Sequence, residues 1–237
     1  MSNFNVNKIL NEICQIIVDN LPKIQENRYR IELKSDNTPV TKSDIYIEDL
    51  VHSYLKEFLP NICFIGEESF DFTIPNNEDY IVILDPIDGT ENFSSGLKEW
   101  GVSFGLWRSD RYLGSFILLP ELELKLISGD FVKPYQSRII GLSSSVTKPV
   151  ISKLNEPGEY RIMGCAVYNI YNVIHGSFYR FVNPEGAYVW DFLPGIMLAL
   201  QNGCQVKVNG EIYNGEFLDP RRKYCIDIIN NHAKKIK

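Results

Sequence analysis

Long apolar runs are absent from this 237-residue sequence. The longest ones, such as 81–84 and 196–200, are far shorter than the roughly 18 to 20 residues that a helix needs to cross a bilayer. The first residues also lack the basic segment and the cleavable apolar stretch of a secretory signal. We therefore expect a protein without membrane contact that resides in the cytoplasm.

Closely spaced cysteines are lacking as well. The five cysteines are an odd number and form no C-x-x-C pair, which argues against a zinc ribbon and against a disulfide framework. We expect them to be small residues of the core. They are Cys14, Cys63, Cys165, Cys204 and Cys225.

Positive charge is in short supply. The 24 Lys and Arg residues are outnumbered by 30 Asp and Glu residues, which gives a formal net charge of -6. This charge would repel the phosphate backbone of a nucleic-acid polymer, so we expect no partner of that class. The excess of acid suits a protein that collects divalent cations, and a soluble surface explains it equally well.

Apolar material is present in sufficient amount for a sizeable core. Apolar residues make up 44% of the chain and aromatic residues 12%, which excludes a disordered or collagen-like protein. The length fits one large domain or two small ones. No repeat, low-complexity segment or Gly/Ser-rich linker marks a boundary between two halves.

Two amphipathic helices are predicted near the N-terminus. Apolar residues recur at three- and four-residue spacing from Phe4 to Ile17, which predicts a buried helical face that ends or kinks near Pro22. The capping pattern from Thr41 to Asp44 opens a second helix, which we expect to extend from about Ser43 to Phe58.

Shorter apolar runs follow these helices. Segments 63–65 and 80–84 are bounded by polar residues, as expected of buried strands. The stretch 101–128 is rich in aromatic and β-branched residues with turn material between them, and it predicts an antiparallel meander. Its expected strands are 101–107, 111–119 and 122–128.

Strands and helices alternate after this meander. We expect an N-terminal α+β lobe at 1–135 and a C-terminal α/β lobe at 136–237. The expected strands of the second lobe are 138–142, 161–163, 177–182 and 205–208, and its expected helices are 146–154, 165–175 and 191–201.

Three acidic clusters stand at the end of a predicted strand or the start of a predicted helix. Glu67 follows the first strand, Asp85 and Asp88 follow the second, and Asp191 opens the last helix. Ligands of layered α/β proteins collect at the carboxyl ends of strands, and carboxylates held there repel one another unless a cation lies between them. Oxygen donors without nearby His or Cys suit Mg²⁺ or Mn²⁺ better than zinc.

The middle cluster also offers a seat for phosphate. Pro86 stiffens the turn, Gly89 lets the backbone approach a ligand closely, and Thr90 begins a short helical turn whose free N–H groups can bind an anion. Metal and phosphate are thus placed together. Two cations that bridge a phosphoryl group are used for its in-line displacement by an activated water.

Taken in order, these segments resemble the signatures of the inositol monophosphatase superfamily of Mg²⁺-dependent, lithium-sensitive phosphatases. The matching strings are GEES at 66–69, DPIDGTENF at 85–93 and WD at 190–191, with KSDNTPVTKSD at 34–44 and MGCA at 163–166. The resemblance implies the fold of that superfamily, an α/β sandwich of alternating helix and sheet layers (αβαβα). It also implies two or three Mg²⁺ ions, with Mn²⁺ as an alternative.

The resemblance assigns the metal ligands residue by residue. Glu67, Asp85 and the Ile87 carbonyl would hold one ion. Asp85, Asp88 and Asp191 would hold the second, so that Asp85 bridges the two.

The resemblance also implies catalytic and substrate-side roles. Thr90, hydrogen-bonded to Asp44, would orient and deprotonate the nucleophilic water, and Glu67 would be the third catalytic residue. The Gly89 and Thr90 amides would bind the phosphate. The implied substrate-side residues are Gly164, Cys165, Ala166 and Glu185.

Three departures from the superfamily pattern leave the substrate open. The glycine-rich hairpin G-x-G-A-x-x-N-G is missing from 128–138, so a homodimer is an open alternative. The glutamate that grips the inositol hydroxyls in animal enzymes is replaced by Pro184, with Glu185 one position away. The K-S-D-N-T-P-V-T run is closer to bacterial 3'-phosphoadenosine 5'-phosphate phosphatases, but those tend to carry G-S-S-x-K where 164–168 reads GCAVY.

Three hypotheses on function result. The first is a Mg²⁺-dependent phosphomonoesterase that hydrolyses a small polyol or sugar monophosphate similar to inositol 1-phosphate. The second is a 3'(2'),5'-bisphosphate nucleotidase that acts on 3'-phosphoadenosine 5'-phosphate. The third is a non-catalytic protein that binds a small phosphorylated metabolite on the same frame.

Overall fold

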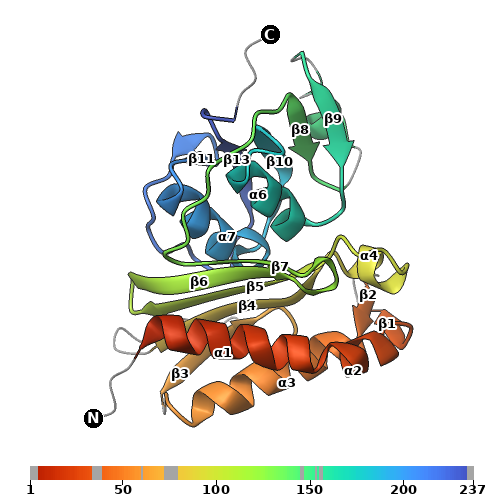
Figure 1. Ribbon diagram of the computed structural model, residues 1–237, viewed down its shortest axis with the longest axis vertical. Helices are drawn as coiled ribbons and strands as arrows, with labels where there is room; N and C mark the ends of the chain where they lie inside the picture. The colour runs from red at the N-terminus through yellow and green to blue at the C-terminus, as the bar shows by residue number, and fades with distance from the viewer. Residues whose placement is uncertain are drawn as a thin grey trace.

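The computed structural model describes residues 5–33, 39–59, 61–71, 80–144, 147–152, 154 and 157–233. Figure 1 shows two β-sheets with a pair of helices between them and further helices on the outer face of the first sheet. The layered α/β fold implied by the resemblance is therefore confirmed.

The outer helical layer precedes the first sheet in the chain. It consists of α1 (Val6–Asp19), α2 (Leu21–Glu26) and α3 (Lys42–Lys56). The predicted kink near Pro22 is the start of a separate helix, because proline is tolerated in a first turn, where its missing N–H would have no helical partner. Helix α3 begins as predicted, with Thr41 and Asp44 forming a reciprocal capping box.

The first sheet has the strand order β3-β4-β5-β6-β7. Strands β3 and β4 are parallel and the other neighbours are antiparallel, so the predicted meander is confirmed. Strand β4 continues past its predicted end through Pro86, where the register with β5 shifts and a missing N–H removes no regular ladder bond. The strands are β3 (Ile62–Gly66), β4 (Tyr80–Asp88), β5 (Gly101–Arg108), β6 (Arg111–Leu119) and β7 (Leu124–Ile127).

Three small elements complete this part of the chain. An antiparallel hairpin of β1 (Ile31–Leu33) and β2 (Pro39–Thr41), which was not predicted, leads into α3. Helix α4 (Thr90–Ser94) follows β4, as expected of the short turn at Thr90. The 3-10 helix η1 (Pro120–Leu122) joins β6 to β7.

The middle layer consists of α6 (Ala166–Ile174) and α7 (Val189–Gln201). Both helices contact strands of both sheets, as Figure 1 shows for α7 above β6 and below β11. Most residues of α7 are buried, because a helix packed on two sides must be apolar nearly all round.

The second sheet has the order β12-β11-β13-β10-β8-β9. Strands β8, β9 and β10 run parallel, while β13 pairs antiparallel with both β10 and β11. The central strand β13 was not predicted, although its residues alternate between buried and half-buried as in a typical strand. The strands are β8 (Ile139–Leu142), β9 (Glu159–Ile162), β10 (Arg180–Ala187), β11 (Gln205–Val208), β12 (Glu211–Ile212) and β13 (Tyr224–Ile229).

A thin final layer covers the outer face of the second sheet. Helix α5 (Lys148–Ile151) is shorter than the predicted helix at 146–154, part of which lies outside the described residues. Its Val150 packs in a small apolar cluster with Ile140 and Val182 of the sheet.

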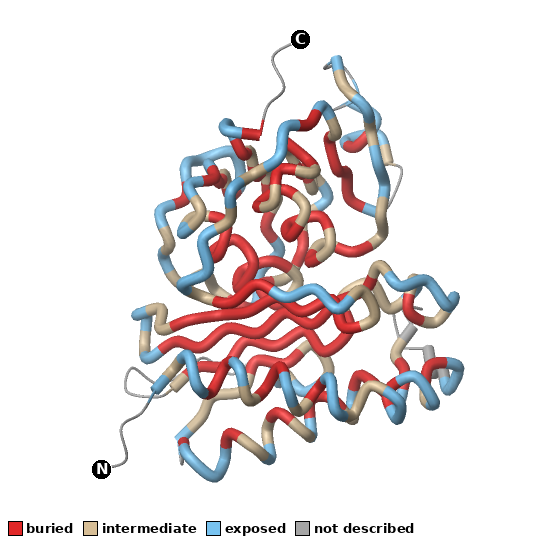
Figure 2. Tube along the Cα trace, in the orientation of Figure 1, coloured by how far each residue is buried: buried red, intermediate tan, exposed pale blue. Residues whose placement is uncertain are grey.

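The buried residues form two large clusters. One lies between the outer helices and the first sheet, and the other extends from the first sheet through α6 and α7 to the second sheet. Figure 2 shows this continuous red band along the sheet strands and middle helices. The second cluster contains residues from both sides of the predicted boundary at 135/136, which stays a prediction. No helix in the described part of the chain is long and apolar enough to cross a membrane.

Candidate active site

A cleft of about 1060 Å³ opens where β3, β4, α4, α6 and α7 meet the ends of β8 and β10. Asp44 and Asp85 are buried and do not line it, nor does Ile87. Eight of the predicted site residues line the cleft, namely Glu67, Asp88, Gly89, Thr90, Gly164, Cys165, Ala166 and Asp191. The structure thus brings together segments that are far apart in the sequence.

The two aspartates of β4 are held by backbone N–H groups. Asp85 is 1% exposed, and its Oδ1 accepts a hydrogen bond from the Ile87 N–H at 3.0 Å. Asp88 Oδ2 accepts the Val167 N–H and, at 3.1 Å, the Cys165 thiol. These contacts fasten the start of α6 to the end of β4.

Glu67 and Asp191 enter the cleft from two other elements. Glu67 follows β3, and its N–H donates to the Leu84 carbonyl at 3.1 Å, which continues the pairing of the two parallel strands. Asp191 lies in the first turn of α7, where its Oδ2 accepts the Tyr188 N–H at 2.8 Å. Both side chains are half-buried.

Asp44 is tied to its own helix cap. Its Oδ2 accepts hydrogen bonds from the Thr41 N–H at 2.8 Å and the Thr41 hydroxyl at 2.6 Å, while its buried Oδ1 has no partner. The Thr90 hydroxyl donates to the Ile87 carbonyl at 3.0 Å. The implied hydrogen bond between Thr90 and Asp44 is therefore not formed here, and each group is instead bonded within its own turn.

The surroundings of these carboxylates disfavour their charged form. Burial is the largest cause, and it raises the pKa of Asp44 and of Asp88 to about 7. Burial followed by the repulsion of Glu67 raises the pKa of Asp85 and Asp191 well above their usual range. A group of buried acids of this kind calls for a positive counter-charge.

The donor set has the chemistry of a hard-cation site, since every candidate ligand is an oxygen atom. The unpartnered Oδ1 of Asp44 fits a site that is completed by a further group. Within the residues that the structure describes, however, no three Asp, Glu, His or Cys side chains are already grouped so that they could hold a metal ion. The carboxylates are hydrogen-bonded to the chain instead.

The turn predicted to bind phosphate leads into α4, the short helical turn that was expected at Thr90. Gly89 adopts a left-handed φ of 84° at the start of α4, and a Cβ there would lie 2.9 Å from the Cys165 Cβ. The Asn92 side chain donates to the Glu99 and Met163 carbonyls, both at 2.7 Å. These contacts hold α4 against the segment that leads into Gly164 and α6.

The predicted substrate side is only partly assembled at the cleft. Cys165 caps α6, with its Sγ accepting the Tyr168 N–H at 3.2 Å, and burial raises the pKa of its thiol well above the usual range. Glu185, in contrast, does not line the cleft, because its exposed carboxylate accepts a hydrogen bond from the Thr147 hydroxyl. Asn183 and Gly186 of the same strand line the cleft instead.

Lys223 is a cleft residue that sequence reasoning missed. Among the described residues that line the cleft it is the only Lys or Arg, and its Nζ lies 4.9 Å from the centre of the Tyr188 ring. It counteracts the rise in the pKa of Asp191. Recognition of β13 was the signal that could have found it, since Lys223 directly precedes that strand.

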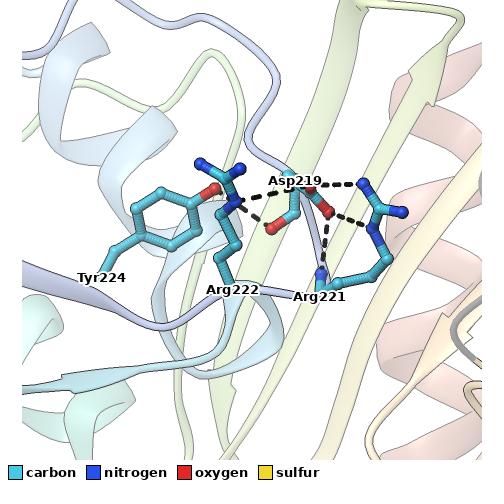
Figure 3. A network of polar contacts seen from close by, with 4 residues as sticks. All are labelled: Asp219, Arg221, Arg222 and Tyr224. Carbon is cyan, nitrogen blue, oxygen red and sulfur yellow. Dashed lines mark hydrogen bonds and ion pairs between the residues drawn. The ribbon is translucent and has the colours of Figure 1, made fainter.

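The turn before β13 is held by a small polar network (Figure 3). Asp219 accepts from the Arg221 guanidinium at 2.8 Å and pairs with Arg222 at 3.7 Å, and the Tyr224 hydroxyl donates to the Asp219 carbonyl at 3.1 Å. The hydrogen bond from Arg221 lowers the pKa of Asp219 to about 2. This network fixes the entry into β13 and thereby the position of Lys223.

Residues 3–136 match the model of the inositol monophosphatase family, which is more than half of the chain. The chain belongs to this family. A similar inositol monophosphatase structure, an "IMPase/NADP phosphatase complexed with Mg2+ and phosphate", superposes with a TM-score of 0.80 and 18% identity over 96% of this chain and 91% of that one. It confirms the fold.

Two curated relatives differ in how much they share with this family member. The 3'(2'),5'-bisphosphate nucleotidase CysQ of Haemophilus influenzae is 27% identical over 119 residues, which are 48% of this chain and 44% of that protein. The fructose-1,6-bisphosphatase/inositol-1-monophosphatase of Aquifex aeolicus is 23% identical over 93% of this chain and 90% of its own length. The chain therefore spans less than half of the Haemophilus relative.

Proposed function

We propose that this protein is a divalent-cation-dependent phosphomonoesterase that acts on a small polyol or sugar monophosphate. The observation that carries the proposal is the convergence of buried and half-buried carboxylates from the ends of β3 and β4 and the start of α7 beside the Gly89 turn, in and next to one cleft. The similar inositol monophosphatase structure, which is complexed with Mg²⁺ and phosphate, supports the same chemistry.

The carboxylates are assigned to two cations. Glu67, Asp85 and the Ile87 carbonyl would hold one, and Asp85, Asp88 and Asp191 would hold the other. When bound, the cations supply positive charge for the phosphoryl oxygens and lower the pKa of a water molecule. Mg²⁺ is the proposed ion, two or three per chain, and Mn²⁺ is the alternative.

The remaining roles belong to groups of the chain itself. The Thr90 hydroxyl would orient the attacking water and the Asp44 carboxylate would take up its proton, since a hydroxyl is a weak base without a carboxylate partner. In the structure these two side chains are hydrogen-bonded to Ile87 and Thr41, not to each other. The Gly89 and Thr90 amides bind phosphate oxygens, and Glu67 completes the catalytic group. Gly164, Cys165 and Ala166 would contact the leaving alcohol.

A bisphosphate substrate is the second candidate. Lys223 is a cation at the edge of an otherwise acidic cleft, where it could pair with a second anionic group. The likeness to the Haemophilus nucleotidase also favours this substrate class. The cytoplasmic location and a homodimer remain predictions of the same kind.

Phosphate release from a panel of esters tests the proposal. The panel contains inositol 1-phosphate, fructose 1,6-bisphosphate, histidinol phosphate and 3'-phosphoadenosine 5'-phosphate, each with Mg²⁺ and with EDTA. We expect release from a monophosphate that requires Mg²⁺ and is lost in Asp88→Asn. A protein that binds Mg²⁺ and these esters by calorimetry but releases no phosphate would instead be the non-catalytic metabolite-binding protein.

A further inference from the structure

Glu48 is a buried acidic residue without a role in the site as described so far. It lies on α3 one helical turn after Asp44, and it is only 6% exposed. None of the ion pairs between described residues includes it. A buried carboxylate without a cation is costly, so its hydrogen bonds indicate what it is kept for.

Those hydrogen bonds come from the turn after β3. Glu48 Oε1 accepts the Glu68 N–H at 2.9 Å, and the Ser69 hydroxyl donates to the same carboxylate. The turn closes on itself through the Phe70 N–H, which donates to the Gly66 carbonyl at 3.0 Å. Glu67 lies inside this turn and lines the cleft. Glu48 therefore grips the backbone on the far side of a proposed metal ligand.

Gly66 leaves free the space that the Glu48 carboxylate occupies. A Cβ at position 66 would lie 2.3 Å from Glu48 Oε1 and 2.8 Å from Ser69 Oγ. The backbone of Gly66 is not among the described positive-φ residues, so alanine there would meet a steric conflict with Glu48 without a conformational one. The position of the buried Glu48 carboxylate therefore depends on the absence of a side chain at Gly66.

We propose that Glu48 is a positioning residue that holds the 66–69 turn so that Glu67 presents its carboxylate to the cation. Because Asp44 and Glu48 belong to the same helix, α3 would fix the position of the catalytic Asp44 relative to the ligand Glu67. The inference rests on the proposed function of the cleft. Groups that orient metal ligands typically influence metal affinity by about 10- to 100-fold.

The test measures Mg²⁺ affinity by isothermal titration calorimetry without substrate, together with the Mg²⁺ concentration for half-maximal phosphatase activity. Glu48→Ala is expected to weaken Mg²⁺ binding by about 10- to 100-fold. Glu48→Gln should retain most of the affinity, since its amide oxygen can accept the same N–H. This rescue separates a positioning role from an effect of negative charge.

Two matched controls lie on the same helix. Val51→Ala removes buried apolar volume one turn further on and should lower the melting temperature without changing Mg²⁺ affinity. Asp49→Asn removes an exposed carboxylate next to Glu48 and should change neither quantity. Near-UV circular dichroism verifies that each variant is folded.

A double-mutant cycle provides a second, independent test. Gly66→Ala should weaken Mg²⁺ binding because the new methyl group displaces the Glu48 carboxylate. In the Glu48→Ala background the same substitution should cost much less, so the two effects should not add. Gly66→Ala on its own also keeps the proposal testable if Glu48→Ala does not fold.

The outcomes distinguish the two proposals. Full additivity, unchanged Mg²⁺ affinity in folded Glu48→Ala, or a Glu48→Gln variant as weak as Glu48→Ala would each overturn the positioning role alone. A wild-type protein that binds no Mg²⁺ and releases no phosphate would overturn the function on which it rests.

Discussion

The acidic side chains in and next to the cleft accept hydrogen bonds from backbone N–H groups. Asp85, Asp88 and Asp191 each accept at least one backbone hydrogen bond, yet the pKa of all three is raised, because burial and mutual repulsion outweigh those bonds. These three aspartates therefore reduce the stability of the metal-free protein. A bound cation would recover that free energy.

Asp85→Asn tests this balance. Without Mg²⁺ the variant should melt at a higher temperature than the wild type, by about 2–4 °C for each kcal/mol of relieved repulsion. The amide oxygen can still accept the Ile87 N–H, so the turn should be preserved. Added Mg²⁺ should no longer raise the melting temperature, and kcat/KM should fall at least about 100-fold.

Asp110→Asn is the matched control for that experiment, since Asp110 is exposed in the turn between β5 and β6. Neither its melting temperature nor its response to Mg²⁺ should change. A metal-free Asp85→Asn protein that melts below the wild type would contradict the account of charge repulsion.

Gly89→Ala tests the phosphate turn. The left-handed φ of 84° costs a non-glycine residue roughly 1–2 kcal/mol, and the methyl group would also lie 2.9 Å from the Cys165 Cβ. We expect a loss of stability in urea unfolding and a loss of phosphatase activity of about 100-fold or more. Gly203→Ala is the control, because its φ of 75° carries the same backbone cost in open space. Equal loss of activity in both variants would refute a specific role for Gly89.

Among the secondary-structure elements, helix α6 connects the site to the second sheet. In its first turn, the Val167 N–H donates a hydrogen bond to Asp88. At its C-cap, the ring of His175 stacks on that of Tyr171, with 3.9 Å between the ring centres. His175 lies outside the predicted site. Its half-buried position nevertheless has a consequence for the pH dependence of folding.

Burial lowers the pKa of His175 below its usual 6.5. As the pH falls through 6.5, the unfolded chain takes up this proton more readily than the folded one, so the free energy of unfolding should decrease toward acid. His175→Gln should lose less stability between pH 7.5 and 5.5 than the wild type, measured by urea denaturation. An identical slope in His175→Gln and the wild type would contradict the prediction.

The apolar cluster that includes α6 and α7 unites the whole molecule. It contains Ile83 and Ile117 of the first sheet as well as Phe181 and Ile226 of the second, so each sheet covers one side of the same helical layer. Neither sheet could bury its inner face without the other half of the chain. The predicted lobes 1–135 and 136–237 are therefore expected to depend on each other for stability.

This dependence can be measured on the full chain and on a fragment. Urea unfolding of the full chain should give one transition that coincides in far-UV circular dichroism and in the fluorescence of Trp100, Trp107 and Trp190. The fragment 1–135, which lacks α6 and α7, should show no near-UV signal and should expose its sheet. Two separate transitions, or a folded fragment, would show that the lobes are independent.

The helices and strands that could be predicted from the amino-acid sequence are those with a local sequence pattern. Apolar spacing and capping residues predicted α1 and α3, and aromatic and β-branched residues with turn material between them predicted the β5–β7 meander. The strings around Glu67, Asp85 and Asp191 indicated the family. These features depend on neighbours within a few residues, so they can be derived from the sequence without knowledge of the fold.

Which distant side chains meet depends on how the separate elements pack. Glu48 of α3 accepts a hydrogen bond from the 66–69 turn, and Lys223 reaches the cleft because β13 inserts between β10 and β11. Glu185 contacts Thr147 outside the cleft. None of these contacts has a local signature, because each depends on how separate elements pack. A short strand such as β13 also derives its stability from two neighbouring strands, which its own residues do not specify.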